Sequence, residues 1–187
     1  MPVRAYIENI SKRFVLGNAT EHTFRGDLQI LLEELVPGIA ATNEPKRIDC
    51  GAPDYVITEQ NIPVGYIEAK DVGVDLGGKG LREQLDRYRA SLDNLIVTDY
   101  LEFRFFLNSA QTTTIRIGEV ADGKIRPIPG KFSEFESHIK EFCSRTPVTI
   151  KSSKRLAEMM AEKAKILAFI IKNALEEDIA AGVESDS

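Results

Sequence analysis

The sequence predicts a mixed α/β core followed by a helical extension. Apolar residues recur at helical spacing in some segments and form short strand-like runs in others. These segments follow one another as helix, strands, helix, strands and helices, which is the order of a mixed α/β domain. The chain has 187 residues, 43% of them hydrophobic and 28% charged, so it is long enough to bury the core of one compact domain.

The first half of the chain is predicted to contain one helix and two strands. Residues 1–19 show an irregular pattern. Residues 20–36 are predicted to form a helix that Pro37-Gly38 ends. Its apolar residues at helical spacing are Phe24, Leu28, Leu31, Leu32 and Leu35. Residues 54–58 and 65–70 are predicted to be strands joined by a hairpin-like connection.

The second half is predicted to alternate in the same way. A glycine-rich loop at 72–80 precedes an amphipathic helix. The residues that mark this helix are Leu81, Leu85, Tyr88 and Leu92. Strands are then expected at 94–98, 102–107 and 113–120, a loop at 121–131, and helices at 132–144 and 152–179. We therefore expect a domain at 1–150 and a helical extension at 151–187.

Composition narrows the possible functions. The longest apolar run near the C-terminus, Ile166–Ile171, is too short to span a bilayer, and the N-terminus lacks an apolar export signal, so we expect a cytoplasmic protein without a membrane partner. Cys50 and Cys143 form no metal-binding pattern. The formal net charge of −5 disfavours tight DNA binding by this chain alone, although metal-binding carboxylates would themselves add negative charge.

The segment that carries chemical information is Ala52–Lys70, APDYVITEQNIPVGYIEAK. Glu68 and Lys70 are two apart on a strand and so point to the same face, whereas Ala69 points to the opposite face. If the two strands form a hairpin, Asp54 lies across from Glu68. Two carboxylates and an ammonium group then converge on one place.

Such a trio suits phosphodiester hydrolysis. Asp54 and Glu68 could share one or two Mg²⁺ ions, with Mn²⁺ as a substitute and the main-chain carbonyl of Ala69 as a further ligand. The metal would stabilise charge in the transition state and lower the pKa of a bound water. Lys70 could orient or help deprotonate that water, or stabilise developing charge. The competing interpretation is that E-x-K is a surface ion pair and that Asp54 only starts a strand.

The helix that follows adds a second signal. Gln84 and Tyr88 are spaced i, i+4 and share a helix face. In one interpretation both point at the acids, where they would contact DNA phosphate or steady Lys70. In the other, Gln84 is an ordinary surface residue and Tyr88 an ordinary core residue. The basic residues of this region are candidate phosphate contacts, or part of a solvated face that balances Glu83 and Asp86. They are Lys79, Arg82, Arg87 and Arg89.

Asp54, Glu68-Ala69-Lys70 and Gln84-x-x-x-Tyr88 together resemble the PD-(D/E)xK nuclease superfamily, in its QxxxY branch. Over about residues 20–170 the chain is similar to the N-terminal nuclease domain of type ISP and type IIG single-polypeptide restriction-modification enzymes. The stretches that carry this similarity include TEHTFRGDLQILLEEL, GYIEAKDV and EQLDRYRASLDNLIVTDYLEFRFF.

The resemblance implies a restriction-endonuclease-like core with a four-stranded mixed sheet flanked by helices. It makes Asp54 and Glu68 metal-binding acids, Lys70 the catalytic lysine, and Gln84 and Tyr88 an accessory pair. These nucleases often have another acid on the first helix. Glu21 is our choice because it lies near the inward face, with Glu34 as the substitute.

The function implied is a Mg²⁺-dependent DNA endonuclease module. Related full-length enzymes continue into a helicase or a methyltransferase with a target-recognition domain, so we expect such parts to be covalently attached in the whole protein. Two alternatives stay open: a non-catalytic DNA-binding or scaffold module of the same fold, and a structure-specific repair or RNA nuclease. A metal-dependent nicking assay separates the first alternative from the endonuclease, and a panel of DNA and RNA substrates separates the second.

Overall fold

A computed structural model describes residues 1–45 and 53–145, together with seven separate positions between 157 and 172. The chain divides into two compact units, residues 1–147 and 148–187. In the second unit the described positions are all helical: 157, 160, 161, 164, 168, 171 and 172. The rest of the helix expected at 152–179 lies outside the described residues.

The first unit contains four α-helices, eight strands and three short 3-10 helices among its described residues. In chain order they are α1 (Pro2–Phe14), η1 (Glu21–Phe24), α2 (Arg25–Leu35), β1 (Ile39–Asn43), β2 (Tyr55–Glu59), β3 (Ile62–Ala69), η2 (Lys79–Leu81), α3 (Arg82–Ser91), β4 (Asn94–Thr98), β5 (Glu102–Leu107), β6 (Ala110–Arg116), β7 (Gly118–Ala121), β8 (Lys124–Pro127), η3 (Pro129–Lys131) and α4 (Phe132–Ser144). The predicted bounds of β4, β5 and α4 are confirmed to the residue.

Six strands form one mixed sheet in the order β1-β2-β3-β4-β5-β6, and β7 pairs with β8 separately. Only β3 and β4 are parallel neighbours in the large sheet. Parallel neighbours need a long crossover, which here contains α3. The expected four-stranded sheet is therefore wrong in strand number, because β1 adds a strand beside β2 and β6 adds one beside β5.

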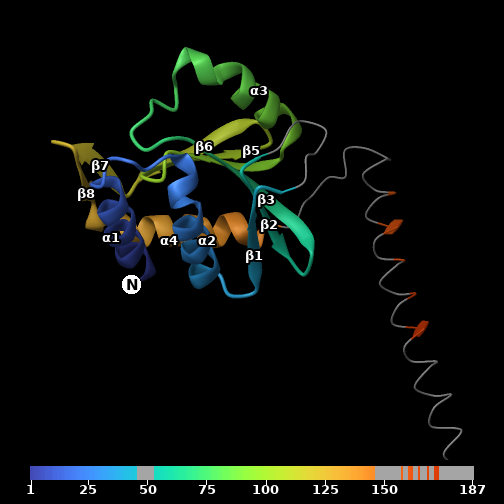
Figure 1. Ribbon diagram of the computed structural model, residues 1–187. Helices are drawn as coiled ribbons and strands as arrows, with labels where there is room; N and C mark the ends of the chain where they lie inside the picture. Colours follow the sequence, from blue (N-terminus) through green and yellow to red (C-terminus); the bar gives the residue numbers. More distant parts are fainter. Residues whose placement is uncertain are drawn as a thin grey trace, which may run out of the picture. The chain divides into compact units, whose positions relative to one another are not determined.

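Helices cover both faces of the sheet. Figure 1 shows α3 on one side and α1, α2 and α4 on the other. Along β3, Ile67 and Ala69 belong to the core on the side of α1, α2 and α4, whereas Tyr66 packs with the apolar residues of α3. Since side chains alternate along a strand, Glu68 and Lys70 are directed to the α3 side. The predicted opposite orientation of Ala69 is confirmed.

The expectation of an irregular segment at 1–19 is wrong, because residues 2–14 form α1. Its buried residues are Val3, Tyr6, Ile7 and Ile10, which are spaced at three and four residues as on one face of a helix. Pro2 stands at the first turn, where a missing N–H costs nothing. The hydroxyl of Tyr6 donates to the carbonyl of Tyr100 at 2.9 Å and ties α1 to the turn after β4.

Three hairpins in the described sheet region are closed by two-residue turns in which both residues have positive φ. The turns are Gln60-Asn61, Asn108-Ser109 and Asp122-Gly123. This backbone matches the twist of antiparallel strands. Two expectations are wrong in this region. Residues 121–131 are not all loop, because 124–127 form β8 after the third turn. Residues 113–120 are not one strand, because the chain leaves the large sheet near Ile117 to enter β7.

Helix α4 packs closely against β3. A Cβ atom added at Gly65 would lie 2.3 Å from Cζ of Phe142, so only glycine allows this approach. Asn94 donates from its side-chain amide to the carbonyls of Val64 and Phe142, at 2.7 and 2.9 Å, and fixes the same contact. The neighbouring Cys143 is 1% exposed. Among the residues that the structure describes, no helix is both long and apolar enough to cross a bilayer.

Candidate functional site

The hairpin of β2 and β3 brings Asp54 and Glu68 to the same end of the sheet. Tyr55 pairs with Ile67, so the next antiparallel pair outward is Asp54 with Glu68. One carboxylate oxygen of Asp54, Oδ2, accepts a hydrogen bond from the backbone N–H of Ala69 at 2.8 Å. The side chain of Asp54 is therefore held against the strand that carries Glu68.

The carboxylate of Glu68 is almost completely buried, with a side chain 2% exposed. Its Oε1 accepts hydrogen bonds from Nζ of Lys70 and from Nε2 of Gln84, both at 2.6 Å. Its Oε2 is buried and has no hydrogen-bond partner among the described residues. Gln84 thus reaches the predicted site from α3, but it contacts Glu68 and not Lys70.

The pKa values of Glu68 and Lys70 are set by burial and by the neighbouring acids. Burial and then the charge of Asp54 raise the pKa of Glu68, the bond from Lys70 opposes this rise, and the resulting pKa is about 7. Burial by itself lowers the pKa of Lys70, but the bond and charge of Glu68 outweigh burial, and the pKa is raised. Glu68 therefore changes charge near neutral pH, whereas Lys70 stays an ammonium group.

The other half of the QxxxY pair, Tyr88, lies in the apolar cluster on the α3 side and is 2% exposed. The guanidinium of Arg87 lies over its ring, 5.7 Å from the centroid. Gln84 and Tyr88 share a helix face as predicted, with Gln84 at the acids and Tyr88 in the packing beneath α3.

Of the two acids proposed on the first predicted helix, Glu21 is the one that lies near Asp54 and Glu68. Its N–H donates to Asp71 and its carbonyl accepts from the hydroxyl of Tyr100, both at 2.8 Å. Its charge adds to the burial-driven rise in the pKa of Glu68. Glu34 is exposed and lines a shallow pocket between α1 and α2 instead.

Arg25, which was not predicted from the sequence as a site residue, joins the acids. Its guanidinium donates from Nη2 to Glu21 at 2.6 Å and to Oδ1 of Asp54, and from Nη1 to Glu44 at 2.8 Å. The side chain is 9% exposed. Three carboxylates from η1, from the end of β1 and from the start of β2 therefore share one guanidinium.

A signal for Arg25 was present in the sequence. Arg25 continues the buried stripe of Leu28 and Leu32 at helical spacing, and a charge on such a stripe needs a partner. Glu21, four residues earlier, is the local candidate for that partner. Asp54 and Glu44 are distant in sequence, so their part in the cluster could not be read from spacing.

The donor set fits a hard divalent cation. No group of three His, Cys, Asp or Glu side chains suited to a metal occurs in the described part of the chain. Mg²⁺, however, is commonly held by one or two carboxylates, with water and phosphate oxygens completing its shell. Oε2 of Glu68, which lacks a partner in the described part of the chain, fits such an ion, because a buried carboxylate oxygen normally has a partner.

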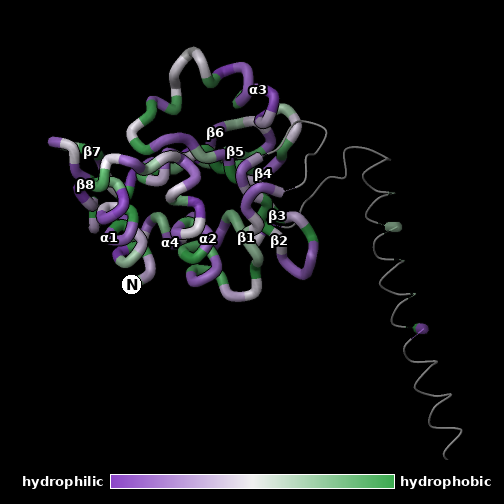
Figure 2. Tube along the Cα trace, in the orientation of Figure 1, coloured by the Kyte–Doolittle hydropathy of each residue, from purple (hydrophilic) through white to green (hydrophobic). Residues whose placement is uncertain are grey.

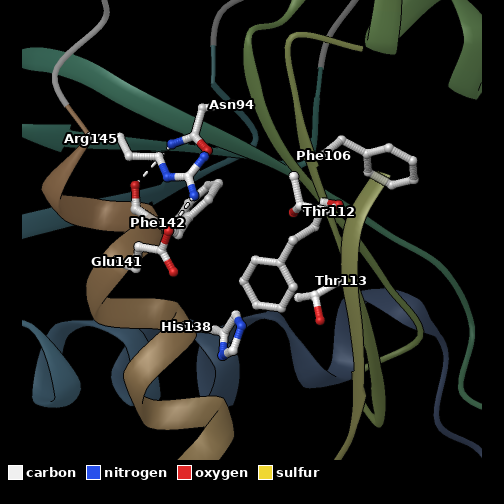
Figure 3. A pocket seen from close by; sticks show the side chains of 9 residues that line it. Asn94, Phe106, Thr112, Thr113, His138, Glu141, Phe142 and Arg145 are labelled. Carbon is white, nitrogen blue, oxygen red and sulfur yellow. Dashed lines mark hydrogen bonds and ion pairs between the residues drawn. The ribbon is translucent and has the colours of Figure 1, made fainter. Parts of the chain in front are cut away.

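A pocket of the described residues lies away from these acids. It has a volume of about 230 Å³ and is lined by Phe105, Phe106, His138, Glu141 and Arg145, among others (Figure 3). It adjoins the start of β4, whereas the acids lie beside Ala69, which pairs with the end of β4. Glu141 and Arg145 pair with each other at 2.5 Å, and none of the predicted site residues lines the pocket.

Comparison with known proteins gives a fold relationship. No protein-family model matches the chain, and no curated protein matches its sequence. A solved structure titled "cryoEM structure DrdV-DNA complex" contains a chain that superposes with a TM-score of 0.56 at 19% identity, over 77% of this chain and 95% of that one. The two chains share a fold. At this identity, the likeness to DrdV concerns the fold alone.

Proposed function

We propose that the chain is the metal-dependent DNA endonuclease module of a restriction-modification enzyme. The observation that carries the proposal is the convergence of Asp54, Glu68, Lys70 and Gln84, with one buried oxygen of Glu68 unbonded among the residues that the structure describes. The fold shared with a chain from a DrdV–DNA complex supports DNA as the substrate.

Asp54 and Glu68 would hold Mg²⁺, or Mn²⁺ in its place, with Glu21 and the main-chain carbonyl of Ala69 as further oxygen donors. The metal would supply charge neutralisation at the phosphate and a lowered pKa for a bound water. The bond from the Ala69 N–H to Asp54 and the bond from Gln84 to Glu68 fix the orientation of the two carboxylates.

Lys70 is the group of this chain that meets the reacting phosphate. Its ammonium lies 2.6 Å from Glu68 and its side chain is 15% exposed, so it is held by the acid and still reaches solvent. From there it orients the attacking water and stabilises the negative charge that develops on the phosphate. Glu68 keeps Lys70 protonated, which suits electrostatic stabilisation better than proton abstraction.

The DNA would lie along α3, whose residues are mostly hydrophilic (Figure 2). Arg82 and Arg87 are exposed there. Arg89 instead donates to the carbonyl of Ser109 and covers the ring of Phe106 at 5.0 Å. The side chain of Lys79 lies outside the described part. Sequence recognition would come from attached methyltransferase or helicase and target-recognition parts.

A plasmid-nicking assay tests the proposal. We expect the chain to nick supercoiled DNA with Mg²⁺ or Mn²⁺ and not with a chelator. Asp54→Ala and Lys70→Ala should lower the rate by roughly 100-fold or more, because each removes a group that acts on the metal or the phosphate. Thermal melting should show that both variants remain folded.

Glu34→Gln is the matched control, because Glu34 is an exposed acid of α2 outside the cluster, and it should leave nicking unchanged. Nicking by Asp54→Ala at the wild-type rate would place the active site elsewhere. Metal-independent DNA binding without nicking would favour the non-catalytic module, and cleavage of RNA in preference to DNA would favour the other nuclease class.

A further inference from the structure

Among the described residues, the guanidinium of Arg25 is hydrogen-bonded only to carboxylates. It bonds to Glu21, Glu44 and Asp54 through its two terminal nitrogens, and its Nε is buried without a partner among the described residues. The side chain is 9% exposed, so water does little to screen the charge. An arginine stays protonated under all ordinary conditions and cannot lose its charge to make room for another cation.

Asp54 has both oxygens engaged. Oδ1 accepts from Arg25, and Oδ2 accepts from the backbone N–H of Ala69 at 2.8 Å. Glu68 differs, because its Oε2 has no hydrogen-bond partner within the described ranges of the chain. A divalent cation that binds Asp54 and Glu68 together therefore approaches a carboxylate that already carries an ion pair, and it meets a second positive charge there.

We propose that Arg25 is a positioning residue that holds Asp54 in the metal-free protein and competes with the divalent metal for it. The inference rests on the proposed function. In the metal-free protein, Arg25 offsets the repulsion among Glu21, Glu44 and Asp54. When a metal binds Asp54, Glu44 and Oε1 of Glu21 remain to hold the guanidinium, which leaves the other oxygen of Glu21 for the metal. Arg25 thereby weakens metal binding and keeps the site formed without metal.

A direct measurement of Mn²⁺ binding tests this inference. It uses electron paramagnetic resonance and calorimetry on the whole chain without DNA. Arg25→Gln removes the charge and should tighten Mn²⁺ binding on the order of tenfold, because a nearby positive charge is lost from a poorly screened site. Arg25→Lys keeps the charge and should bind Mn²⁺ close to the wild-type affinity. Arg13→Gln is the matched control, since Arg13 of α1 pairs with Asp27 of α2 at 2.9 Å, and it should leave the Mn²⁺ affinity unchanged.

Thermal melting supplies the second measurement. Arg25→Gln should melt below the wild type without metal, and saturating Mn²⁺ should raise its melting temperature more than that of the wild type. A merely structural role would lower stability without tightening Mn²⁺ binding. A variant that stays unfolded at saturating Mn²⁺ would also contradict the inference, because a metal that replaces Arg25 should restore the site.

The result also separates this inference from the proposed function. If Asp54→Ala loses Mn²⁺ while Arg25→Gln binds it no more tightly than the wild type, competition by Arg25 is wrong and the metal site stands. If neither the wild type nor Arg25→Gln binds Mn²⁺, the metal site itself is wrong, and the inference falls with it.

Discussion

At the scale of single residues, Glu68 is the group in the candidate site whose ionised form is most costly. It is buried, it stands near Asp54, and only one of its two oxygens is hydrogen-bonded within the described structure. Such a carboxylate is costly to ionise. A bound cation would offset this cost, so the metal-free protein is expected to be least stable above about pH 7, where Glu68 is ionised.

The pKa of Glu68, raised to about 7 chiefly by burial, makes folding stability depend on pH. Below about pH 4.5, the ordinary value, Glu68 is protonated in both the folded and the unfolded state and adds no dependence. Between this value and about 7, the unfolded chain loses the proton while the folded protein keeps it, so stability falls as pH rises. Above about 7 the cost is constant.

We therefore expect Glu68→Gln to melt a few degrees above the wild type at pH 8 in the absence of metal, with the difference shrinking toward pH 5. Melting curves across this range check the prediction. Glu34→Gln, at an exposed position of α2, should show no such trend. A Glu68→Gln protein less stable than the wild type at pH 8 would mean that the ionised carboxylate stabilises the fold.

At the scale of elements, β3 organises the molecule. It pairs with β2 on one side and β4 on the other, and it turns alternate side chains to the two helical layers. Its alternation made Glu68 and Lys70 predictable from the sequence, because an i, i+2 pair on a strand shares a face whatever the rest of the fold does.

Other elements carried weaker or different signals. Strand β1 is short and half exposed, so it lacks an apolar run. Helix α1 does show buried residues at helical spacing, and β8 follows an Asp-Gly turn, which is a strong hairpin signal, so both could have been predicted. The ion pairs of Arg25 with Glu44 and Asp54 could not have been predicted, since these residues meet only through the tertiary fold.

The contact of α4 with β3 depends on a glycine. Gly65→Ala places a methyl group against the ring of Phe142 and should destabilise the protein by about 1–3 kcal/mol, as overpacking does in other cores. Denaturant unfolding measures the change. The matched control is Gly26→Ala in α2, where an added Cβ meets nothing within 4 Å, and stability there should rise slightly because alanine favours helix. Equal behaviour of the two variants would show that Phe142 moves aside freely.

At the scale of the whole molecule, charge limits what the chain does alone. Its net charge of −5 repels DNA, and the exposed cations of α3 offset this only locally. The phosphate contacts available to Arg82 and Arg87 carry no base identity. The isolated chain should therefore bind DNA weakly and without sequence preference.

Fluorescence anisotropy with two unrelated duplexes, at about 50 and about 200 mM salt, checks this expectation. Binding should be equal for both duplexes and should fall steeply with salt. Arg82→Gln and Arg87→Gln should each weaken binding and reduce the salt slope by about 1. Arg4→Gln, on α1 across the sheet, should have no effect. Tight binding that distinguishes the duplexes would place sequence recognition within this chain.

The packing of α4 on β3 also provides the protein with an internal reporter. Burial raises the pKa of the Cys143 thiol to about 12, and the side chain is 1% exposed, so a thiol reagent can modify it only after α4 has left the sheet. In a Cys50→Ser background, the modification rate at pH 8 should equal the rate for a free thiol multiplied by the fraction of time that the helix is open. If Mn²⁺ slows the modification, α4 opens in the same event as the site of Asp54 and Glu68. If Mn²⁺ leaves the rate unchanged, α4 opens independently of that site.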